Sequence, residues 1–79
     1  MNNEYIEEVY FLEGFESALL GIGQQFNTKF AIYDKQKCIE VLMKDMSIEE
    51  AEEYFDFNMQ GAYVGPNTPV FLYEDEEFE

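Results

Sequence analysis

Residues 30–42 read Phe30-Ala31-Ile32-Tyr33-Asp34-Lys35-Gln36-Lys37-Cys38-Ile39-Glu40-Val41-Leu42 and change from a strand pattern to a helix pattern at one residue. The run 30–33 is apolar and β-prone, which is typical of a strand. Asp34 is a favourable N-cap, because its carboxylate can accept a hydrogen bond from a free N–H of the first helical turn. We therefore predict a helix over 35–46, whose apolar face has the spacing i, i+1, i+4, i+8 and comprises Cys38, Ile39, Leu42 and Met46.

The segment before this strand has the features of its hairpin partner. Residues 18–24 form a short apolar run with two glycines, which disfavours a helix and suits a strand that another group approaches closely. The polar break at 25–29 is typical of a turn. We predict a β-hairpin over 18–33.

A second helix begins with a capping box, Ser47-Ile48-Glu49-Glu50, in which the first and last side chains each satisfy a free backbone N–H. An apolar stripe follows at helical spacing and comprises Ile48, Ala51, Phe55, Met59 and Ala62. We expect Phe55 to be buried with Ile39 and Leu42 of the first helix. Gly61 or Gly65 ends the second helix, because Pro66 and Pro69 bar further helix, and residues 70–73 form a last strand.

These elements predict an α+β fold, a small antiparallel sheet of the hairpin plus the C-terminal strand, covered on one face by two helices. The chain has 79 residues without a repeat or a flexible linker, which indicates one domain over 1–79. Residues 1–16 are an acidic N-terminal segment, and 1–17 are predicted to be irregular or an edge strand. The acidic tail 74–79 is expected to fray.

The charge is strongly unbalanced, with 18 Asp and Glu against four Lys and a formal net charge of −14. Such a surface repels phosphate backbones and anionic lipid, which argues against direct binding of nucleic acid or membrane. It favours a basic protein surface, including one that normally holds nucleic acid. We expect a monomer or a weak homo-oligomer.

The residue types also exclude several kinds of chemistry. There is no histidine, no tryptophan and one cysteine, which excludes an internal disulfide, a zinc site and a histidine-based triad. We predict that the protein is not an enzyme and has no catalytic residue, cofactor or metal site. No apolar run is long enough to span a membrane, and the first residues do not show the basic region and apolar run of a secretory signal, so we expect a cytoplasmic protein.

The first candidate site is an acidic face on the second helix. It comprises Glu49, Glu52, Glu53 and Asp56, at i, i+3, i+4 and i+7, opposite the apolar stripe. Carboxylates at these spacings lie roughly 5–6 Å apart, comparable with the charges along a nucleic-acid strand. The face is either a partner-binding surface, in one version a nucleic-acid mimic, or an ordinary solvated helix surface.

Three further candidates have simpler structural explanations. A pocket beside Tyr63 is one interpretation of Asn58, Gly61, Gly65, Asn67 and Thr68, but these residues are also typical of a helix end and a turn. Gly21-Ile22-Gly23 lacks the third glycine of a dinucleotide fingerprint, so a close backbone approach explains it better. Cys38 has no histidine to activate it and fits a buried small apolar residue.

Residues 18–71 are similar to a family of small uncharacterised proteins of tailed bacteriophages and their hosts. The resemblance rests on 20–23, 31–34, 38–42 and above all on Glu50-Ala51-Glu52-Glu53-Tyr54-Phe55-Asp56-Phe57-Asn58, Gly61-Ala62-Tyr63-Val64-Gly65 and Thr68-Pro69-Val70-Phe71. The link at 45–47 is shorter than is usual in that family, and Tyr63 stands where it often has Trp. The resemblance implies a phage-associated accessory protein in the host cytoplasm and brings no known activity.

Two functions are compatible with these features. The first is an interaction protein that binds a host or phage protein through its acidic surface, in the sharper version a host-takeover or anti-defence inhibitor of a nucleic-acid-binding protein. The alternative is a homo-oligomeric structural module without an inhibitory role. Its contact surface would be aromatic and would comprise Tyr5, Tyr10, Phe11 and Phe15.

Overall fold

The computed structural model describes residues 9–73 and confirms the α+β class. Residues 1–8 and 74–79, which include the tail predicted to fray, lie outside the described part. In chain order the elements are the 3₁₀ helix η1 (Glu16–Ala18), β1 (Leu19–Gln25), β2 (Thr28–Asp34), α1 (Lys35–Leu42), α2 (Ile48–Tyr54), the π-helix η2 (Phe55–Gln60) and β3 (Val70–Leu72).

The predicted hairpin is confirmed. β1 and β2 pair antiparallel, with Ile22 opposite Ala31, and a two-residue turn joins them. The register shifts between Leu19 and Gly21, a bulge that the sequence pattern does not predict. The close approach expected at the glycines occurs at Gly23, where an added Cβ would lie 2.9 Å from side-chain atoms of Ile32 and of Phe30. The approaching groups are therefore side chains and not backbone, and Gly21 has nothing within 4 Å.

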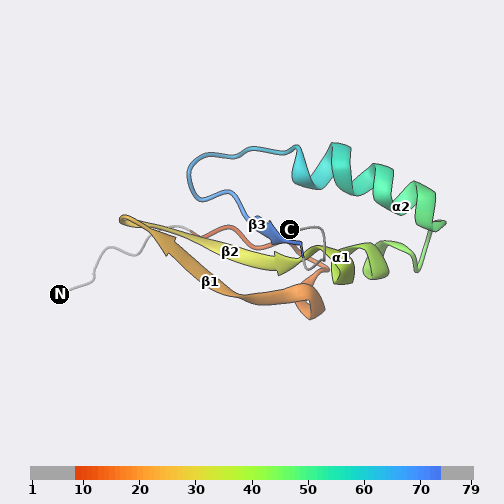
Figure 1. The fold of residues 1–79 in the computed structure, drawn as a ribbon, viewed down its shortest axis with the longest axis horizontal. Coiled ribbons are helices and arrows are strands. Elements are labelled where there is room, and N and C mark those ends of the chain that lie inside the picture. Colours follow the sequence, from red (N-terminus) through yellow and green to blue (C-terminus); the bar gives the residue numbers. More distant parts are fainter. Residues whose placement is uncertain (1–8, 74–79) are drawn as a thin grey trace, which may run out of the picture.

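The predicted last strand is present, but its direction corrects the expectation of an antiparallel sheet. β3 pairs parallel to β2, with Ile32 beside Val70 and Tyr33 beside Phe71, so the three-stranded sheet is mixed and has the order β1-β2-β3. The reason lies in the connection, because residues 35–69 pass through both helices and return the chain to the end at which β2 began. Figure 1 shows β3 beside β2, joined to the helices by a long loop.

The N-cap of α1 is confirmed, since the Asp34 carboxylate accepts a hydrogen bond from the backbone N–H of Lys37 at 3.1 Å. The helix ends at Leu42, however, and not at Met46 as predicted. Two turn-type bonds, from Lys44 N to Val41 O and from Asp45 N to Leu42 O, tighten the chain there. The helix ends early because Ser47, the N-cap of α2, has an extended backbone. The residues between Leu42 and Ser47 therefore form the turn that connects the two helices.

The capping box of α2 is confirmed in both directions. The Ser47 hydroxyl accepts from the backbone N–H of Glu50, and the Glu50 carboxylate accepts from that of Ser47. After seven residues the α-helix passes into η2, a π-helix that the sequence pattern does not predict. Gly61 ends it, as one of the two expected glycines. A Cβ there would lie 3.2 Å from the carbonyl oxygen of Asp56, which favours glycine at this end.

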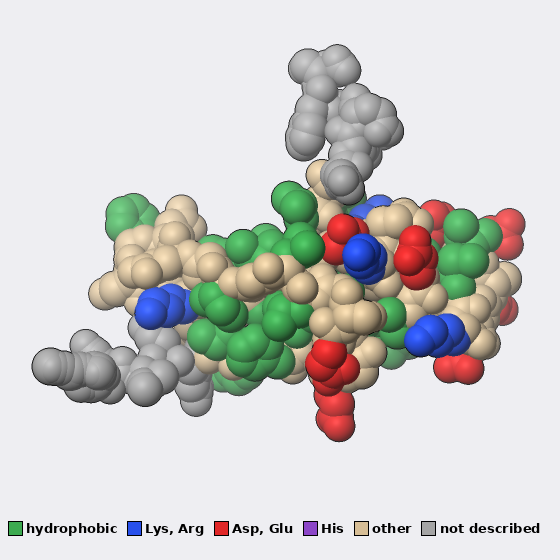
Figure 2. All heavy atoms as spheres, turned by 90° about the horizontal axis from the view of Figure 1, so that it is seen from below, with side chains coloured by type: hydrophobic (Ala, Val, Ile, Leu, Met, Phe, Trp, Pro, Cys, Tyr) green, Lys and Arg blue, Asp and Glu red, His purple; other side chains and the backbone are tan. Residues whose placement is uncertain are grey.

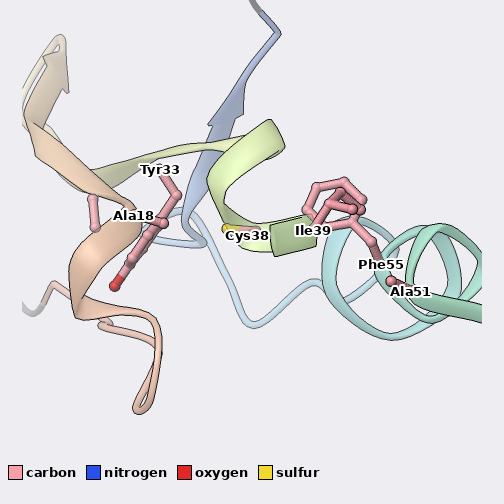
Figure 3. Packing of buried hydrophobic residues seen from close by; sticks show 7 residues of the cluster. Ala18, Tyr33, Cys38, Ile39, Ala51 and Phe55 are labelled. Atoms are coloured by element: carbon pink, nitrogen blue, oxygen red, sulfur yellow. The ribbon is translucent and has the colours of Figure 1, made fainter. Parts of the chain in front are cut away.

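The core lies between the sheet, α1 and the second helix, and its fully buried residues are Ala18, Ala31, Tyr33, Cys38, Ile39, Ala51 and Phe55. Figure 3 shows Phe55 beside Ile39, with Tyr33 in a second part of the cluster near Ala18. The Phe55 ring meets the Phe71 ring edge to face, with centroids 4.8 Å apart. The predicted burial of Phe55 with Ile39 is confirmed, and Leu42 packs half-buried against them.

The two ends of the predicted apolar stripe lie outside this core. Ile48 and Ala62 are exposed, while Met59 is half-buried and packs against the cluster. The stripe assumed one continuous α-helix, but only its middle lies against the sheet and α1. Apolar residues at both ends of the helix are thus left at the surface.

The N-terminal segment completes the cover of the core. Residues 9–15 are irregular, as predicted for this region, and Val9, Leu12 and Phe15 pack against the core cluster. The backbone N–H of Leu12 donates a hydrogen bond to the Tyr33 hydroxyl at 2.8 Å. The core on the Tyr33 side of the sheet is therefore covered by this segment as well as by the helices.

Candidate functional site

The structure places all four residues of the predicted acidic face at the surface. Glu49, Glu52 and Glu53 are exposed on α2, and Asp56 is exposed on η2. Ala51 and Phe55, which alternate with them along the chain, are fully buried and hold the helix against the core. The π-helical turn begins before Asp56, so α-helical spacing relates only the first three carboxylates. A role of these residues in binding remains a prediction.

The electrostatic setting of the acidic face is one of separated charge. Within residues 9–73 no lysine forms an ion pair with these four carboxylates. The lysines lie on β2, on α1 and just after it, and the ammonium group of Lys35 sits 4.4 Å from the Tyr73 ring centroid and 5.7 Å from that of Phe55. The helix dipole favours an acid in the first turn, such as Glu49, but does not offset acids further along. The face is therefore a concentrated negative patch.

A groove adjoins the acidic face and gives it an apolar side. It is open to solvent, has a volume of about 480 Å³ and is lined by Met46, Glu50, Glu53, Tyr54, Phe57 and Asn58. Glu53 belongs both to the groove and to the acidic face. The Phe57 ring is 72% exposed and Tyr54 is also exposed. An ammonium or guanidinium group can meet aromatic rings and carboxylates together here, and both kinds of contact favour a cation.

Sequence reasoning missed this groove, although a signal was present. Tyr54 and Phe57 stand three residues apart, and neither fits the apolar stripe that contains Phe55. Two large aromatic side chains at helical spacing outside the buried stripe indicate an exposed aromatic patch. The π-helix itself carries no such sequence signal, and π-helical turns are frequent at functional sites.

The second candidate, around Tyr63, follows the simpler explanation. The Thr68 hydroxyl accepts from the backbone N–H of Val64 at 2.8 Å and donates to the carbonyl oxygen of Gly65 at 2.6 Å. The side-chain amide of Asn67 donates to the carbonyl oxygen of Lys29 at 2.8 Å and ties the loop to the hairpin. These polar groups shape the loop, and Asn58 lies apart from them in the groove described above.

Cys38 is buried, as predicted. Burial, with a smaller contribution from the negative charge of Asp34, raises the pKa of its thiol from 9.0 to about 11. A thiol that stays protonated at neutral pH is a poor nucleophile and a poor metal ligand. The structure thus uses Cys38 as a small apolar residue of the core.

In the described residues, no three or more His, Cys, Asp and Glu side chains gather in a way that could hold a metal ion. No helix within 9–73 combines the length and the apolar character needed to cross a membrane.

Comparison of the chain with protein-family models, with curated proteins and with solved structures gives no match. The resemblance to small phage proteins therefore stays a prediction.

Proposed function

We propose that this chain is a non-enzymatic binding protein whose acidic face docks on a basic surface of another protein. One observation supports this most strongly. Four exposed carboxylates without lysine partners in the described chain adjoin a groove with exposed aromatic rings. Long-range attraction would speed association, and the rings would supply the short-range contact that slows dissociation.

The sharper form of the proposal concerns the type of partner. Carboxylates spaced along one helix face resemble the spacing of phosphate charges, so a nucleic-acid-binding protein is the best match among basic surfaces. Occupation of its basic site would block nucleic acid. With the resemblance noted above, this makes the chain a phage-type accessory factor that acts in host takeover or against host defence.

The test compares two triple variants with the same change of charge. Glu49→Lys, Glu52→Lys and Glu53→Lys alter the acidic face, and Glu74→Lys, Glu76→Lys and Glu77→Lys alter the C-terminal tail. Immobilised protein is incubated with bacterial host lysate at low and at moderate salt, and captured proteins are identified by mass spectrometry. We expect a basic protein that the parent and the tail variant retain and that the acidic-face variant loses.

The kinetics of the captured partner sharpen the test. The tail variant should associate more slowly with nearly unchanged dissociation, as expected of charges at the rim of an interface. Capture that is insensitive to salt would contradict the electrostatic proposal. Equal binding by both triple variants would show that the acidic face is only a solvated helix surface.

A second candidate function is self-assembly through the N-terminal aromatic residues. Tyr10 and Phe11 are exposed, Phe15 is half-buried, and Tyr5 lies outside the described residues. Phe11→Ser removes the more exposed ring without touching the core cluster. If this surface assembles, sedimentation velocity should show an oligomer for the parent and a monomer for Phe11→Ser at the same concentration.

A further inference from the structure

β1 is an outer strand of the sheet, and beyond the bulge between Leu19 and Gly21 it lacks the usual protection of such edges. The other outer strand, β3, is only three residues long and follows Pro69, and both features discourage pairing with a further strand. β1 has seven residues and contains neither a proline nor a charged residue. The uncharged run extends from residue 17 to residue 28 in a chain with a net charge of −14. Within residues 9–73 no strand pairs with the outer side of β1, so its outward backbone groups form a template for another strand.

The side chains along this edge are also unusually apolar for a surface. Leu19, Leu20 and Ile22 on β1 and Phe26 at the turn are all exposed. Figure 2 shows hydrophobic side chains gathered over the hairpin half of this view, while acidic side chains lie toward the middle and the helix half. Figure 1 shows β1 as the outermost strand, with α2 across the sheet from it and α1 at the end of β2. In this view the less acidic half of the described surface thus coincides with the open edge.

Phe26 adds a conformational argument. Its φ is +58°, the left-handed region that glycine and asparagine occupy easily and that a bulky residue occupies only under strain. Its ring is 89% exposed, so packing within the chain does not compensate that strain. A strained residue with an exposed aromatic ring at the end of an open edge indicates a contact made outside the chain.

We propose that two copies of this chain pair through their β1 strands, antiparallel around a twofold axis at Ile22, to form one continuous six-stranded sheet. In this register Ile22 faces its own copy, and Phe26 at the turn lies toward the bulged start of β1 in the second copy. The strand that pairs with β1 comes from a second copy, because the edge offers no charge to attract a charged partner. For the same reason, pairing brings no carboxylates of the two strands together despite the net charge of each chain.

Salt separates this inference from the proposed function. Each copy carries the same net negative charge, so screening should strengthen the dimer, whereas it should weaken binding of a basic partner to the acidic face. The two surfaces also lie on different elements. Failure of one proposal therefore leaves the other intact.

The main experiment is sedimentation velocity of the full chain over a wide range of concentration, with a matched pair of variants. Ile22→Lys places two ammonium groups opposite each other at the twofold axis, and Ile48→Lys makes the same change on α2 at a similar exposure, 45% against 49%. We expect a dimer for the parent and for Ile48→Lys, and a dissociation constant raised tenfold or more for Ile22→Lys. A parent that stays monomeric at every concentration, or equal effects of the two variants, would overturn the proposal.

A second variant guards against misfolding as an explanation. Phe26→Gly relieves the left-handed strain, so the monomer should unfold at the same or a higher temperature while the dimer weakens. Hydrogen exchange of the parent should show backbone amides of β1 becoming protected as the concentration rises. Protection that is independent of concentration, or a Phe26→Gly dimer as strong as the parent, would contradict pairing through this edge.

Discussion

The hydroxyl of Tyr33 accepts a hydrogen bond from the backbone N–H of Leu12, across 21 residues of sequence and at a distance of 2.8 Å. Tyr33 is fully buried in the core, and Leu12 is half-buried in the irregular N-terminal segment. A single polar atom at the end of an apolar ring thus fixes a segment without regular secondary structure onto the sheet. This contact makes the N-terminal segment part of the fold.

Tyr33→Phe should keep the ring in place and remove the acceptor. The Leu12 N–H then loses its partner, and we expect the free energy of unfolding to fall by about 1–3 kcal/mol. Chemical denaturation measures the change, and hydrogen exchange should show faster exchange at Leu12. An unchanged midpoint would mean that water replaces the hydroxyl at little cost.

Ser47→Ala should destabilise the start of α2. Removal of the capping hydroxyl costs about 0.5–2 kcal/mol, because the N–H of Glu50 loses its acceptor. Glu50→Gln is the control, since an amide can still accept from the N–H of Ser47 and completes the same box. Thermal denaturation should show a lower midpoint for Ser47→Ala and nearly the parent value for Glu50→Gln.

Phe55→Ala should remove the central ring of the core. Truncation of a buried phenylalanine costs about 3–5 kcal/mol, which is most of the stability of a small domain. Phe57→Ala is the matched control, because the same change two residues away affects a ring that is largely exposed. Its effect should stay within about 0.5 kcal/mol. Similar losses for both variants in urea denaturation would show that the assignment of buried and exposed rings is wrong.

Cys38 should make the fold sensitive to alkaline pH. The thiol ionises near pH 9.0 in the unfolded chain and near pH 11 in the folded one, so between these values the unfolded state binds fewer protons. Stability therefore falls as the pH rises through this window and is fully present below it. Denaturation of the parent and of Cys38→Ala at several alkaline pH values should show a steeper decline for the parent. Parallel declines would contradict the raised pKa.

Local features of the fold could be predicted from the sequence, because the residues that encode them are neighbours. Asp34 and the capping box, from Ser47 to Glu50, set the helix starts through contacts within four residues. The hairpin follows from a polar break between two apolar runs. The burial of Phe55 follows from helical periodicity alone.

The features that were missed depend on the path of the whole chain. The direction of β3 is decided by the end of the sheet to which the helical connection 35–69 returns the chain, and the three residues of the strand do not encode it. α1 ends before Met46 because Ser47, as the N-cap of α2, has an extended backbone. Tyr54 and Phe57 indicate an exposed aromatic patch, but the groove also depends on the π-helical turn at Phe57 and Asn58, which no residue pattern in the chain indicates. The exposure of the acidic face, in contrast, could be predicted, because charged side chains at helical spacing opposite a buried stripe face solvent.

The parallel pairing of β3 with β2 has a consequence for the order of folding. β1 and β2 are adjacent in sequence, so their hairpin closes over a two-residue loop, whereas β3 must find β2 across both helices. Such distant pairing is slow, since the entropy of closing the intervening chain is lost before the contact is gained. Until Phe71 arrives, the rings of Tyr33 and Phe55 lack their common neighbour and the edge of β2 stands open as well as that of β1. The nascent chain thus passes through a stage at which β2 can pair with a wrong strand, and the arrival of one three-residue strand ends it.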